Sequence, residues 1–523
     1  MTYLLKIIDP VLPETQLLSI EENTLLLNAL RLHDIPFHAP CNGNGLCRKC
    51  LIHVRGLGDK LACQFRITQN LEVVLPKREK ASILTENSLI LKEFPFHPGF
   101  MKIRSDHSLR LFYGDQFLEN LSEELPFIGL AIDIGTTTVA LYLHDLSANR
   151  HLDTAAFLNP QHSFGQDVIS RIQFTLEKED GLTLLRERLI STLNDSLGRL
   201  FDKHRLSPQQ VYKVAVVGNP TMLHLFAGIS PASIAVAPFT PVFTEMKTVS
   251  GRESLLAIHP LARVFLLPSL SGYVGADITA GLAATPLLQE SSLSLFLDIG
   301  TNGEMALGNR DEILCCATAA GPAFEGGHIR CGMGAVSGAI CAFRQKHYET
   351  LDNQKPIGIC GSGLLDLTAA LLDSGTISPE GFLAQDVIVE EAAQTGNGRN
   401  IILTPQDVRE VQLAKAAIAA GIDILLSESG HSLKQIKTVY LAGGFGNHLP
   451  VDSAVRIGLL PTLLKDKTVP IGNSAGAGAQ LFLKSTFFEK ELQETISRCR
   501  YVELSGRPDF NDRFADQLLF PTS

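Results

Sequence analysis

The sequence predicts an α/β protein with a small N-terminal module, a connector and two related halves. The first observation is LAIDIGTTTVAL (residues 130–141), an apolar run that breaks at Gly135 and resumes after three threonines. The second is the return of this pattern as LFLDIGTNGEMAL (residues 295–307), which indicates a duplication. The third is a glycine-rich loop with clustered cysteines near the N-terminus. Apolar and β-branched runs favour buried strands and glycine favours the turn between them, so each repeat predicts a β-hairpin.

Chain length and motif order predict several domains. A chain of 523 residues is too long for a single hydrophobic core, and its length predicts roughly three or four domains. We expect a cysteine-containing module over residues 1–78 and a linker or small middle domain over 79–127. The first half then covers 128–290 and the second covers 291–523.

Composition limits the partners and the compartment. The formal net charge is -10 with acidic and basic residues interspersed, which argues against a nucleic-acid-binding face and a polybasic membrane patch. The first ten residues lack the apolar core of a signal peptide, and no long uncharged apolar run follows. Ten cysteines are too few and too clustered for a disulfide framework. We therefore expect a cytoplasmic protein whose partners are proteins or small molecules.

The N-terminal module carries the clustered cysteines. Residues 3–8 and the segment after Glu14 predict a hairpin, and residues 23–33 show helical spacing behind an asparagine cap. Four cysteines follow with C-x5-C-x2-C-x12-C spacing: Cys41, Cys47, Cys50 and Cys63. Four thiolates suit Zn²⁺ or an iron–sulfur cluster. Glycines in the loop let the backbone aim N–H groups at bridging sulfides, which favours an iron–sulfur cluster and leaves structural zinc as the alternative.

The two hairpins carry the predicted chemistry of the main body. Each tip offers hydroxyls, backbone N–H groups and one carboxylate, a combination that suits phosphate oxygens and Mg²⁺. We expect Asp133 and Asp298 to hold Mg²⁺ through water. The residues expected to contact phosphate are Gly135, Thr136, Thr137, Thr138, Gly300, Thr301 and Asn302.

Downstream glycine-rich segments complete the pattern. TVYLAGGFGNHL predicts a buried strand that ends in Gly443, Gly444 and Gly446, where the missing side chains would let adenosine lie against the backbone. The segment TAAGPAFEGGHIR is equally compatible with ligand approach and with tight packing. The sequence contains no Walker A motif, no G-x-G-x-x-G after a strand and no kinase loop set, so nucleotide binding must use another design.

The order of motifs resembles a known family. The duplicated DIGT hairpins and LAGGFG are similar to the phosphate and adenosine signatures of the actin, sugar kinase and Hsp70-like ATPases. The cysteine loop resembles that of 2Fe-2S ferredoxins, with one residue more than the plant-type spacing. Together with GQDVISRI, GNPTM, VGAD, AAGPAFEG, ICGSGLLD and GNSAGAGA, the chain resembles the reductive activators of corrinoid-dependent methyltransferases, which are iron–sulfur ATPases.

The resemblance implies a fold and an activity. It implies a β-grasp-like ferredoxin domain and a two-lobed ATPase whose second lobe holds the adenosine segment. ATP, Mg²⁺ and a 2Fe-2S cluster would together return the inactive Co(II) of a corrinoid protein to Co(I). Glu304 or Asp277 would orient the water that attacks ATP. It also implies a low-potential electron-donor protein and allows for a homodimer. A small-molecule kinase with a ferredoxin module, or a nucleotide-binding redox sensor without turnover, would share both hairpins.

Overall fold

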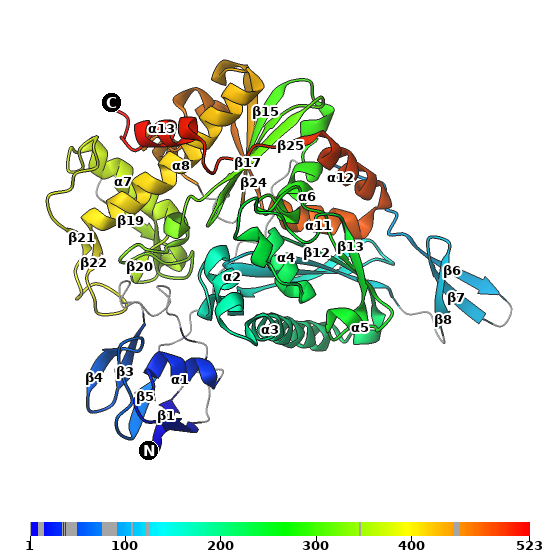
Figure 1. Cartoon of the computed structure of the whole chain (residues 1–523), viewed down its shortest axis with the longest axis horizontal. Helices are drawn as coiled ribbons and strands as arrows, with labels where there is room; N and C mark the ends of the chain where they lie inside the picture. The colour runs from blue at the N-terminus through cyan, green and yellow to red at the C-terminus, as the bar shows by residue number, and fades with distance from the viewer. Residues whose placement is uncertain are drawn as a thin grey trace.

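The N-terminal module is a five-stranded sheet with one helix (Figure 1). The computed structural model describes residues 2–8, 15–33, 35, 37, 50–75, 92–105, 108–121, 126–344, 347–443 and 449–522. The sheet order is β2-β1-β5-β3-β4, formed by β1 (Thr2–Ile8), β2 (Gln16–Glu21), β3 (Leu51–Val54), β4 (Gly58–Leu61) and β5 (Leu71–Val74). The predicted hairpin is confirmed, because β1 and β2 pair antiparallel. Helix α1 (Leu26–Leu32) packs its buried leucines against this sheet.

The predicted asparagine cap of α1 is wrong. Asn23 adopts a positive φ of 66° in the preceding turn, and Leu25 occupies the cap position in an extended conformation without a side-chain cap. Asparagine tolerates the left-handed conformation better than most residues, so Asn23 serves the turn instead of the helix end.

A small antiparallel sheet follows within the expected connector. Its three strands are β6 (Phe100–Ser105), β7 (Ser108–Tyr113) and β8 (Gln116–Leu121), in that order. One face packs on the main body, where the Phe100 ring lies 5.7 Å from that of Phe127 and 6.3 Å from that of Tyr212. In Figure 1 this sheet projects at the side of the main body away from the N-terminal module.

The first half of the main body is a six-stranded sheet of order β11-β10-β9-β12-β14-β13. Its strands are β9 (Ile128–Ile134), β10 (Thr138–Asp145), β11 (Arg150–Leu158), β12 (Val211–Gly218), β13 (Lys247–Ser250) and β14 (Arg263–Leu266). Its helices are η1 (Pro160–Ser163), α2 (Val168–Glu177), α3 (Gly181–His204), η2 (Pro208–Gln210), α4 (Pro220–Ala227), η3 (Ala232–Ile234), α5 (Gly251–Ser254), α6 (Ala276–Ala284) and η4 (Pro286–Gln289).

The second half contains another six-stranded sheet, of order β24-β23-β15-β16-β17-β25. Its strands are β15 (Leu293–Ile299), β16 (Gly303–Gly308), β17 (Ile313–Thr318), β23 (Ile436–Ala442), β24 (Thr468–Gly472) and β25 (Cys499–Tyr501). Smaller strands are β18 (Ala339–Arg344), β19 (His347–Thr350), β20 (Gly358–Ile359), β21 (Val387–Glu390) and β22 (Ile401–Leu403). The helices are η5 (Pro322–Glu325), η6 (Leu351–Asn353), α7 (Gly361–Asp373), α8 (Pro405–Ser429), η7 (Leu433–Gln435), α10 (Val451–Arg456), η8 (Thr462–Lys467), α11 (Ser474–Lys484), α12 (Thr486–Arg498) and α13 (Pro508–Asp516).

Five strands of each sheet share one topology, as the repeated sequence pattern predicts, and the sixth strand, β13 or β25, lies at opposite ends of the two sheets. In each, an antiparallel hairpin is flanked by a third antiparallel strand on one side and a parallel strand on the other. Strand β9 corresponds to β15, and the parallel neighbour β12 corresponds to β23. Asp133 and Asp298 occupy the same position, one residue before the end of the central strand. The mixed α/β class expected from the sequence is confirmed.

The C-terminal segment crosses back to the first half. Helix α11 contacts β9, β12 and α6, and the side chains of Phe482 and Phe488 belong to the hydrophobic core of the first half. The small residues of α11 allow this contact, since a Cβ added to Gly478 would lie 2.4 Å from the carbonyl oxygen of Ala280. Residues 474–498 therefore pack with the first half, although they lie inside the range 291–523 that was expected to form the second.

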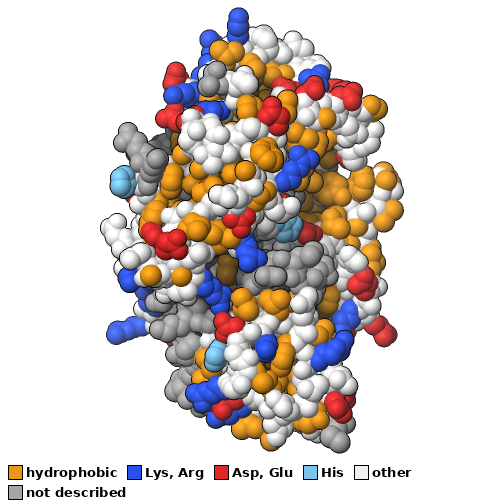
Figure 2. Space-filling view, turned by 90° about the vertical axis from the view of Figure 1, so that its left-hand side faces the viewer, with side chains coloured by type: hydrophobic (Ala, Val, Ile, Leu, Met, Phe, Trp, Pro, Cys, Tyr) orange, Lys and Arg blue, Asp and Glu red, His pale blue; other side chains and the backbone are white. Residues whose placement is uncertain are grey.

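The surface agrees with the composition. On the face shown in Figure 2, acidic and basic side chains are interspersed instead of gathered by sign. Among the helices that the structure describes, none combines the length and the apolar character needed to cross a bilayer.

Candidate functional site

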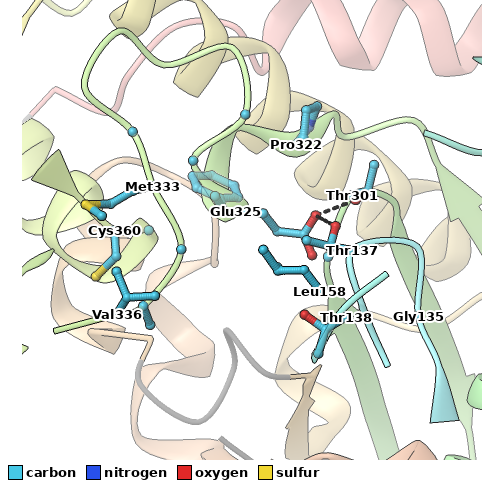
Figure 3. A pocket seen from close by; sticks show the side chains of 18 of the residues that line it. Gly135, Thr137, Thr138, Leu158, Thr301, Pro322, Glu325, Met333, Val336 and Cys360 are labelled. Atoms are coloured by element: carbon cyan, nitrogen blue, oxygen red, sulfur yellow. Dashed lines mark hydrogen bonds between the residues drawn. The ribbon is translucent and has the colours of Figure 1, made fainter. Parts of the chain in front are cut away.

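A cleft of about 2200 Å³ brings the predicted site residues together (Figure 3). Its lining includes the tips of both hairpins, the N-terminus of α6 and the start of α11. It also reaches Phe37, Leu51, Leu61 and Leu75 of the N-terminal module. The cleft is thus continuous from the module that carries the cysteines to the duplicated hairpins.

The first hairpin tip is held from several sides. The Gly135 N–H donates to the Thr138 carbonyl at 2.9 Å, and a Cβ on Gly135 would lie 2.7 Å from that same oxygen. The hydroxyl of Thr136 accepts a hydrogen bond of 2.9 Å from Asn219 Nδ2. Arg171 is fully buried and donates to the Thr136 carbonyl and, at 2.9 Å, to the Gly165 carbonyl. The tip is a rigid loop whose backbone cannot accommodate a larger residue at position 135.

The second hairpin tip is one residue shorter. Its last strand pair is Ile299 with Gly303, and the Gly300 N–H donates to the Asn302 carbonyl at 2.9 Å. Thr301 is buried and lies beside the cleft. The two tips therefore face one space with hydroxyls and backbone amides, although their loop lengths differ.

Glu325 joins the two tips. This residue ends η5, and its Oε2 accepts a hydrogen bond of 3.0 Å from the hydroxyl of Thr137. The same oxygen accepts a second hydrogen bond from the hydroxyl of Thr301. Figure 3 shows both contacts converging on one carboxylate. Burial raises the pKa of Glu325, and the two hydroxyls and Arg171 oppose that shift.

Four further carboxylates lie in the floor of the cleft. Burial, the larger effect, raises the pKa of Asp133 to about 6, while a hydrogen bond from Asn473 lowers it. Burial and the charge of Asp133 raise the pKa of Asp277 to about 7. Burial and the charges of Asp277, Asp133 and Glu325 raise the pKa of Asp298 to about 8. The pKa of Glu304 is also raised well above its ordinary value, by burial and by the neighbouring aspartates.

This cluster of carboxylates is suited to a divalent cation. Like charges in a buried site cannot all ionise without a compensating charge, and oxygen-only donors are the ligands that Mg²⁺ prefers. Within the described residues no three of these carboxylates gather closely enough to ligate an ion together, so the residues present fit a magnesium ion that they hold through water.

A contact from α11 closes one end of the cleft. Asn473 Nδ2 donates to Asp133 Oδ2 at 2.7 Å and lies 3.1 Å from the hydroxyl of Tyr142. Asn473 also caps α11, since its side-chain oxygen accepts from the Gly476 N–H. The returning C-terminal segment thus fixes one of the two repeated aspartates.

The predicted adenosine segment is described only in part. Gly443 follows β23 with a φ of 91°, and a Cβ at this position would lie 2.5 Å from Asp298 Oδ1. Only glycine fits such a conformation beside the aspartate. Gly444 and Gly446 lie outside the described residues.

Two of the four predicted cluster ligands are described. Cys50 and Cys63 are buried, and their sulfur atoms lie 3.2 Å apart. This distance is longer than the ~2.05 Å of a disulfide bond, and it is short enough for both sulfur atoms to bind one metal ion. Cys41 and Cys47 lie outside the described residues, and within the described ones no group of three or more potential ligands of His, Cys, Asp or Glu type gathers. The two described thiols fit a thiolate-ligated metal site.

Sequence reasoning missed four residues that hold the site: Glu325, Asn473 and Asn219, which line the cleft, and Arg171, which is buried behind the first tip. Each belongs to a motif noted in the sequence, but none lies near a hairpin in the chain. The signals present were the polar residues that interrupt small-residue segments, as in NPT, FEGG and GNSAG. Which hairpin each would meet depends on the tertiary fold.

Comparison with known proteins finds relatives along nearly the whole chain. Residues 128–290 match the family model of the RACo middle region, and residues 292–523 match that of the C-terminal ASKHA domain of RACo. The corrinoid activation enzyme RamQ from Eubacterium limosum is 30% identical over an alignment of 594 positions, gaps included, that covers 99% of each chain. The [Co(II) methylated amine-specific corrinoid protein] reductase from Methanosarcina barkeri is 27% identical over 440 aligned residues, covering 75% of this chain and 77% of the relative.

A solved structure matches as well. A reductive activator for a corrinoid, iron–sulfur protein superposes with a TM-score of 0.76 and 32% identity. The match covers 99% of this chain and 98% of the other.

Proposed function

The chain belongs to the family of reductive activators of corrinoid proteins, and we propose that it couples ATP hydrolysis to the one-electron reduction of a corrinoid protein. The observation that carries this proposal is a cleft in which two repeated hairpins and a cysteine-bearing module meet. The relatives act on corrinoid proteins by activation or reduction, which does not favour a small-molecule kinase.

The hairpin cleft supplies the proposed nucleotide site. We assign the phosphates to the tip residues of both hairpins: Gly135, Thr136, Thr137, Thr138, Gly300, Thr301 and Asn302. Asp133 and Asp298 would hold Mg²⁺ through water, and Glu304 or Asp277 would orient the attacking water. The raised pKa values support this assignment, because a cation would stabilise the ionised carboxylates that the apolar surroundings disfavour. Gly443, Gly444 and Gly446 would flank adenosine.

The N-terminal module supplies the proposed electron carrier. Its five-stranded mixed sheet with one helix is consistent with a β-grasp-like ferredoxin domain, and Cys41, Cys47, Cys50 and Cys63 would hold a 2Fe-2S cluster. When bound, such a cluster supplies a one-electron donor of low potential. Apolar residues of this module line the same cleft as the hairpin tips, so the two proposed functions share one space.

The energy balance explains why the two parts belong together. Plant-type 2Fe-2S centres lie near about -400 mV, and each ~59 mV uphill disfavours a one-electron transfer tenfold. Reducing Co(II) to Co(I) requires a still lower potential, so the module alone would leave most of the cobalt oxidised. ATP can drive the transfer only if it binds one conformation better than another, because a ligand with equal affinity shifts no equilibrium.

The remaining features of the proposal concern organisation and partners. We assign residues 1–78 to the ferredoxin domain, 79–127 to the connector, and 128–290 and 291–523 to the two ATPase lobes, with residues 474–498 packed on the first lobe. The sequence lacks the D-x-H-x-x-G motif of many corrinoid carriers, so the corrinoid would belong to a separate protein. A low-potential electron-donor protein, a cytoplasmic location and a homodimer remain predictions.

One experiment tests the proposal directly. Purified protein is mixed with a chemical reductant, Mg²⁺ and a corrinoid carrier in the Co(II) state, with and without ATP, and the cobalt absorption bands are followed. We expect Co(I) to form only with ATP, together with ATP hydrolysis that the carrier stimulates. Equal reduction without ATP would contradict the coupling, and phosphorylation of an added small molecule would favour the kinase.

A further inference from the structure

Glu325 accepts a hydrogen bond from one threonine hydroxyl of each hairpin tip. Thr137 and Thr301 each carry one hydroxyl hydrogen, and both hydroxyls donate it to Glu325 Oε2. The two threonines come from different halves, and they do not hold equivalent positions in the repeat, since Thr301 aligns with Thr136. A single carboxylate therefore ties the two halves together at the point where the tips meet.

A phosphate oxygen and this carboxylate need the same donors. The Thr137 and Thr301 hydroxyls cannot donate to Glu325 and to a phosphate at the same time. A third phosphate placed between the tips would also bring its negative charge against a buried carboxylate, where repulsion is weakly screened. The first two phosphates of a nucleotide can use the backbone amides of the tips without this conflict.

We propose that Glu325 is a latch that the γ-phosphate of ATP displaces and that ADP leaves closed. This inference rests on the proposed function, because it takes ATP as the ligand of the cleft. It assigns Glu325 a role in distinguishing the two nucleotides, and it identifies the event by which ATP would favour one conformation of the protein.

The chain around Glu325 is built to move as a short unit. Two glycines with positive φ, Gly321 at 79° and Gly326 at 80°, flank η5 and leave its ends free of side-chain restraint. Within the unit, the Gly326 N–H donates to the Ala323 carbonyl at 3.0 Å and the Gly327 N–H donates to the Pro322 carbonyl at 2.8 Å. Displacing the carboxylate would therefore shift the whole turn.

The shift would reach another wall of the cleft. A Cβ on Gly326 would lie 2.3 Å from the backbone nitrogen of Met333, so the two backbones are in close contact. The Met333 N–H donates to the Ile359 carbonyl at 2.9 Å, next to Cys360. Figure 3 shows Met333, Val336 and Cys360 on the side of the cleft opposite Thr137 and Thr301. Latch opening would thus change the shape of the cleft away from the hairpins.

Nucleotide affinities test the latch. Calorimetry with Mg²⁺ compares ADP with a non-hydrolysable ATP analogue for the wild type, Glu325→Ala and Glu325→Gln. We expect the affinity for the ATP analogue, divided by that for ADP, to rise about tenfold in the alanine variant. The hydroxyls of Thr137 and Thr301 then bind the γ-phosphate without first breaking their hydrogen bonds to Glu325. The glutamine variant should change the ratio in the same direction. Glu410→Gln is the control: it removes a carboxylate of the second half that pairs with His328 and does not line the cleft, and the ratio should stay within about twofold of the wild type.

Hydrogen–deuterium exchange gives a second measurement on the unmodified protein. The Gly326 and Gly327 amides should exchange faster with the ATP analogue than with ADP. An unchanged affinity ratio in both Glu325 variants, loss of analogue binding by a folded variant, or equal exchange with both nucleotides would overturn the latch while leaving the proposed function intact. A wild type that binds neither nucleotide would overturn the proposed function, and the latch with it.

Discussion

Asn473 donates a hydrogen bond of 2.7 Å to Asp133, which joins the start of α11 to the end of β9. The two residues lie 340 positions apart in the chain. This contact follows from the return of the C-terminal segment to the first half, because α11 packs its small residues on α6 and its cap then faces the first hairpin. Asn473 therefore holds Asp133 and not Asp298, the equivalent aspartate of the second half.

Replacing Asn473 by leucine should shift the pH dependence of ATP hydrolysis. Burial raises the pKa of Asp133 to about 6 and the Asn473 amide opposes this effect, so losing the amide raises the pKa further. If ionised Asp133 is needed, the acid limb of the kcat/KM profile should move to higher pH by up to about one unit. The control is Gln480→Leu. Gln480 lies on α11, the helix that Asn473 caps, and the substitution removes its hydrogen bond with His144, so the acid limb should stay in place. An unmoved limb in the Asn473 variant would show that Asp133 does not govern the profile.

Without magnesium, the protein should lose stability as the pH rises from about 4 to about 8. Asp277 and Asp298 have folded-state pKa values of about 7 and about 8. Below the ordinary pKa of aspartate, both folded and unfolded chains hold these protons. At higher pH the unfolded chain releases them first, so each group can lower the free energy of unfolding by up to about 1.4 kcal/mol per pH unit until its folded pKa is passed.

Urea unfolding at a series of pH values measures this effect. Asp298→Asn should flatten the decline, because the amide does not titrate. Added Mg²⁺ should flatten it as well if the cation stabilises the ionised carboxylates. A stability that increases steadily over this range would contradict the assignment.

The sequence predicted the hairpins because their signals are local. Alternation of apolar residues, a glycine at the turn and an aspartate before it all lie within about a dozen residues, and the repeat marked both copies. The equivalent positions of Asp133 and Asp298 follow from the same pattern, as the two sheets show. The small residues of α11 are likewise visible in the sequence, and they allow its close packing on α6 at Gly478 and Ala280.

The sequence could not predict which distant segments would reach the tips. Glu325 meets Thr137 across 188 positions, and only the tertiary arrangement of η5 brings them together. The motif around Glu325 was equally compatible with packing and with ligand approach. Local preference was also misleading at Asn23, where the asparagine serves a turn instead of the helix cap.

Replacing Cys63 by serine should remove the cluster. Its sulfur lies 3.2 Å from that of Cys50, and a serine hydroxyl is a poor substitute for a thiolate ligand of iron. We expect the variant to lose its visible absorption and its iron. Cys341→Ser, at a cysteine of β18 in the main body, is the control and should keep both. Retained colour in the Cys63 variant, or a wild type that binds zinc and no iron, would contradict the ligand assignment.

Replacing Lys213 by methionine should destabilise the first half. The Lys213 ammonium is buried and lies within hydrogen-bond distance of the carbonyl oxygens of Pro98, Phe482 and Leu483, at 3.1, 2.8 and 3.2 Å. The variant leaves these buried carbonyls without their donor, and we expect a loss of about 2–4 kcal/mol in the free energy of unfolding. Lys247→Met, at an exposed lysine of β13, should change it by less than about 0.5 kcal/mol. Equal effects of the two substitutions would show that the three carbonyls find other partners.

Replacing Arg171 by lysine should weaken nucleotide binding more than it weakens the fold. The Arg171 guanidinium donates to the carbonyls of Thr136 and Gly165 at once and so fixes the first tip from below. A lysine ammonium is a single compact donor and cannot span both carbonyls in the same way. We therefore expect the tip to loosen and the affinity for ATP and ADP to fall together by about tenfold.

The control for Arg171 is a second arginine with a similar structural role. Arg186 also donates to two carbonyls, those of Phe226 and Glu253, but neither of these carbonyls belongs to a hairpin tip. Arg186→Lys should lower the thermal midpoint to a similar degree and leave nucleotide affinity unchanged in calorimetry. If the two variants lose affinity equally, the loss reflects general destabilisation. If Arg171→Lys binds nucleotide as the wild type does, the tip does not depend on this guanidinium, because the contacts of Asn219 and Glu325 then suffice to hold it.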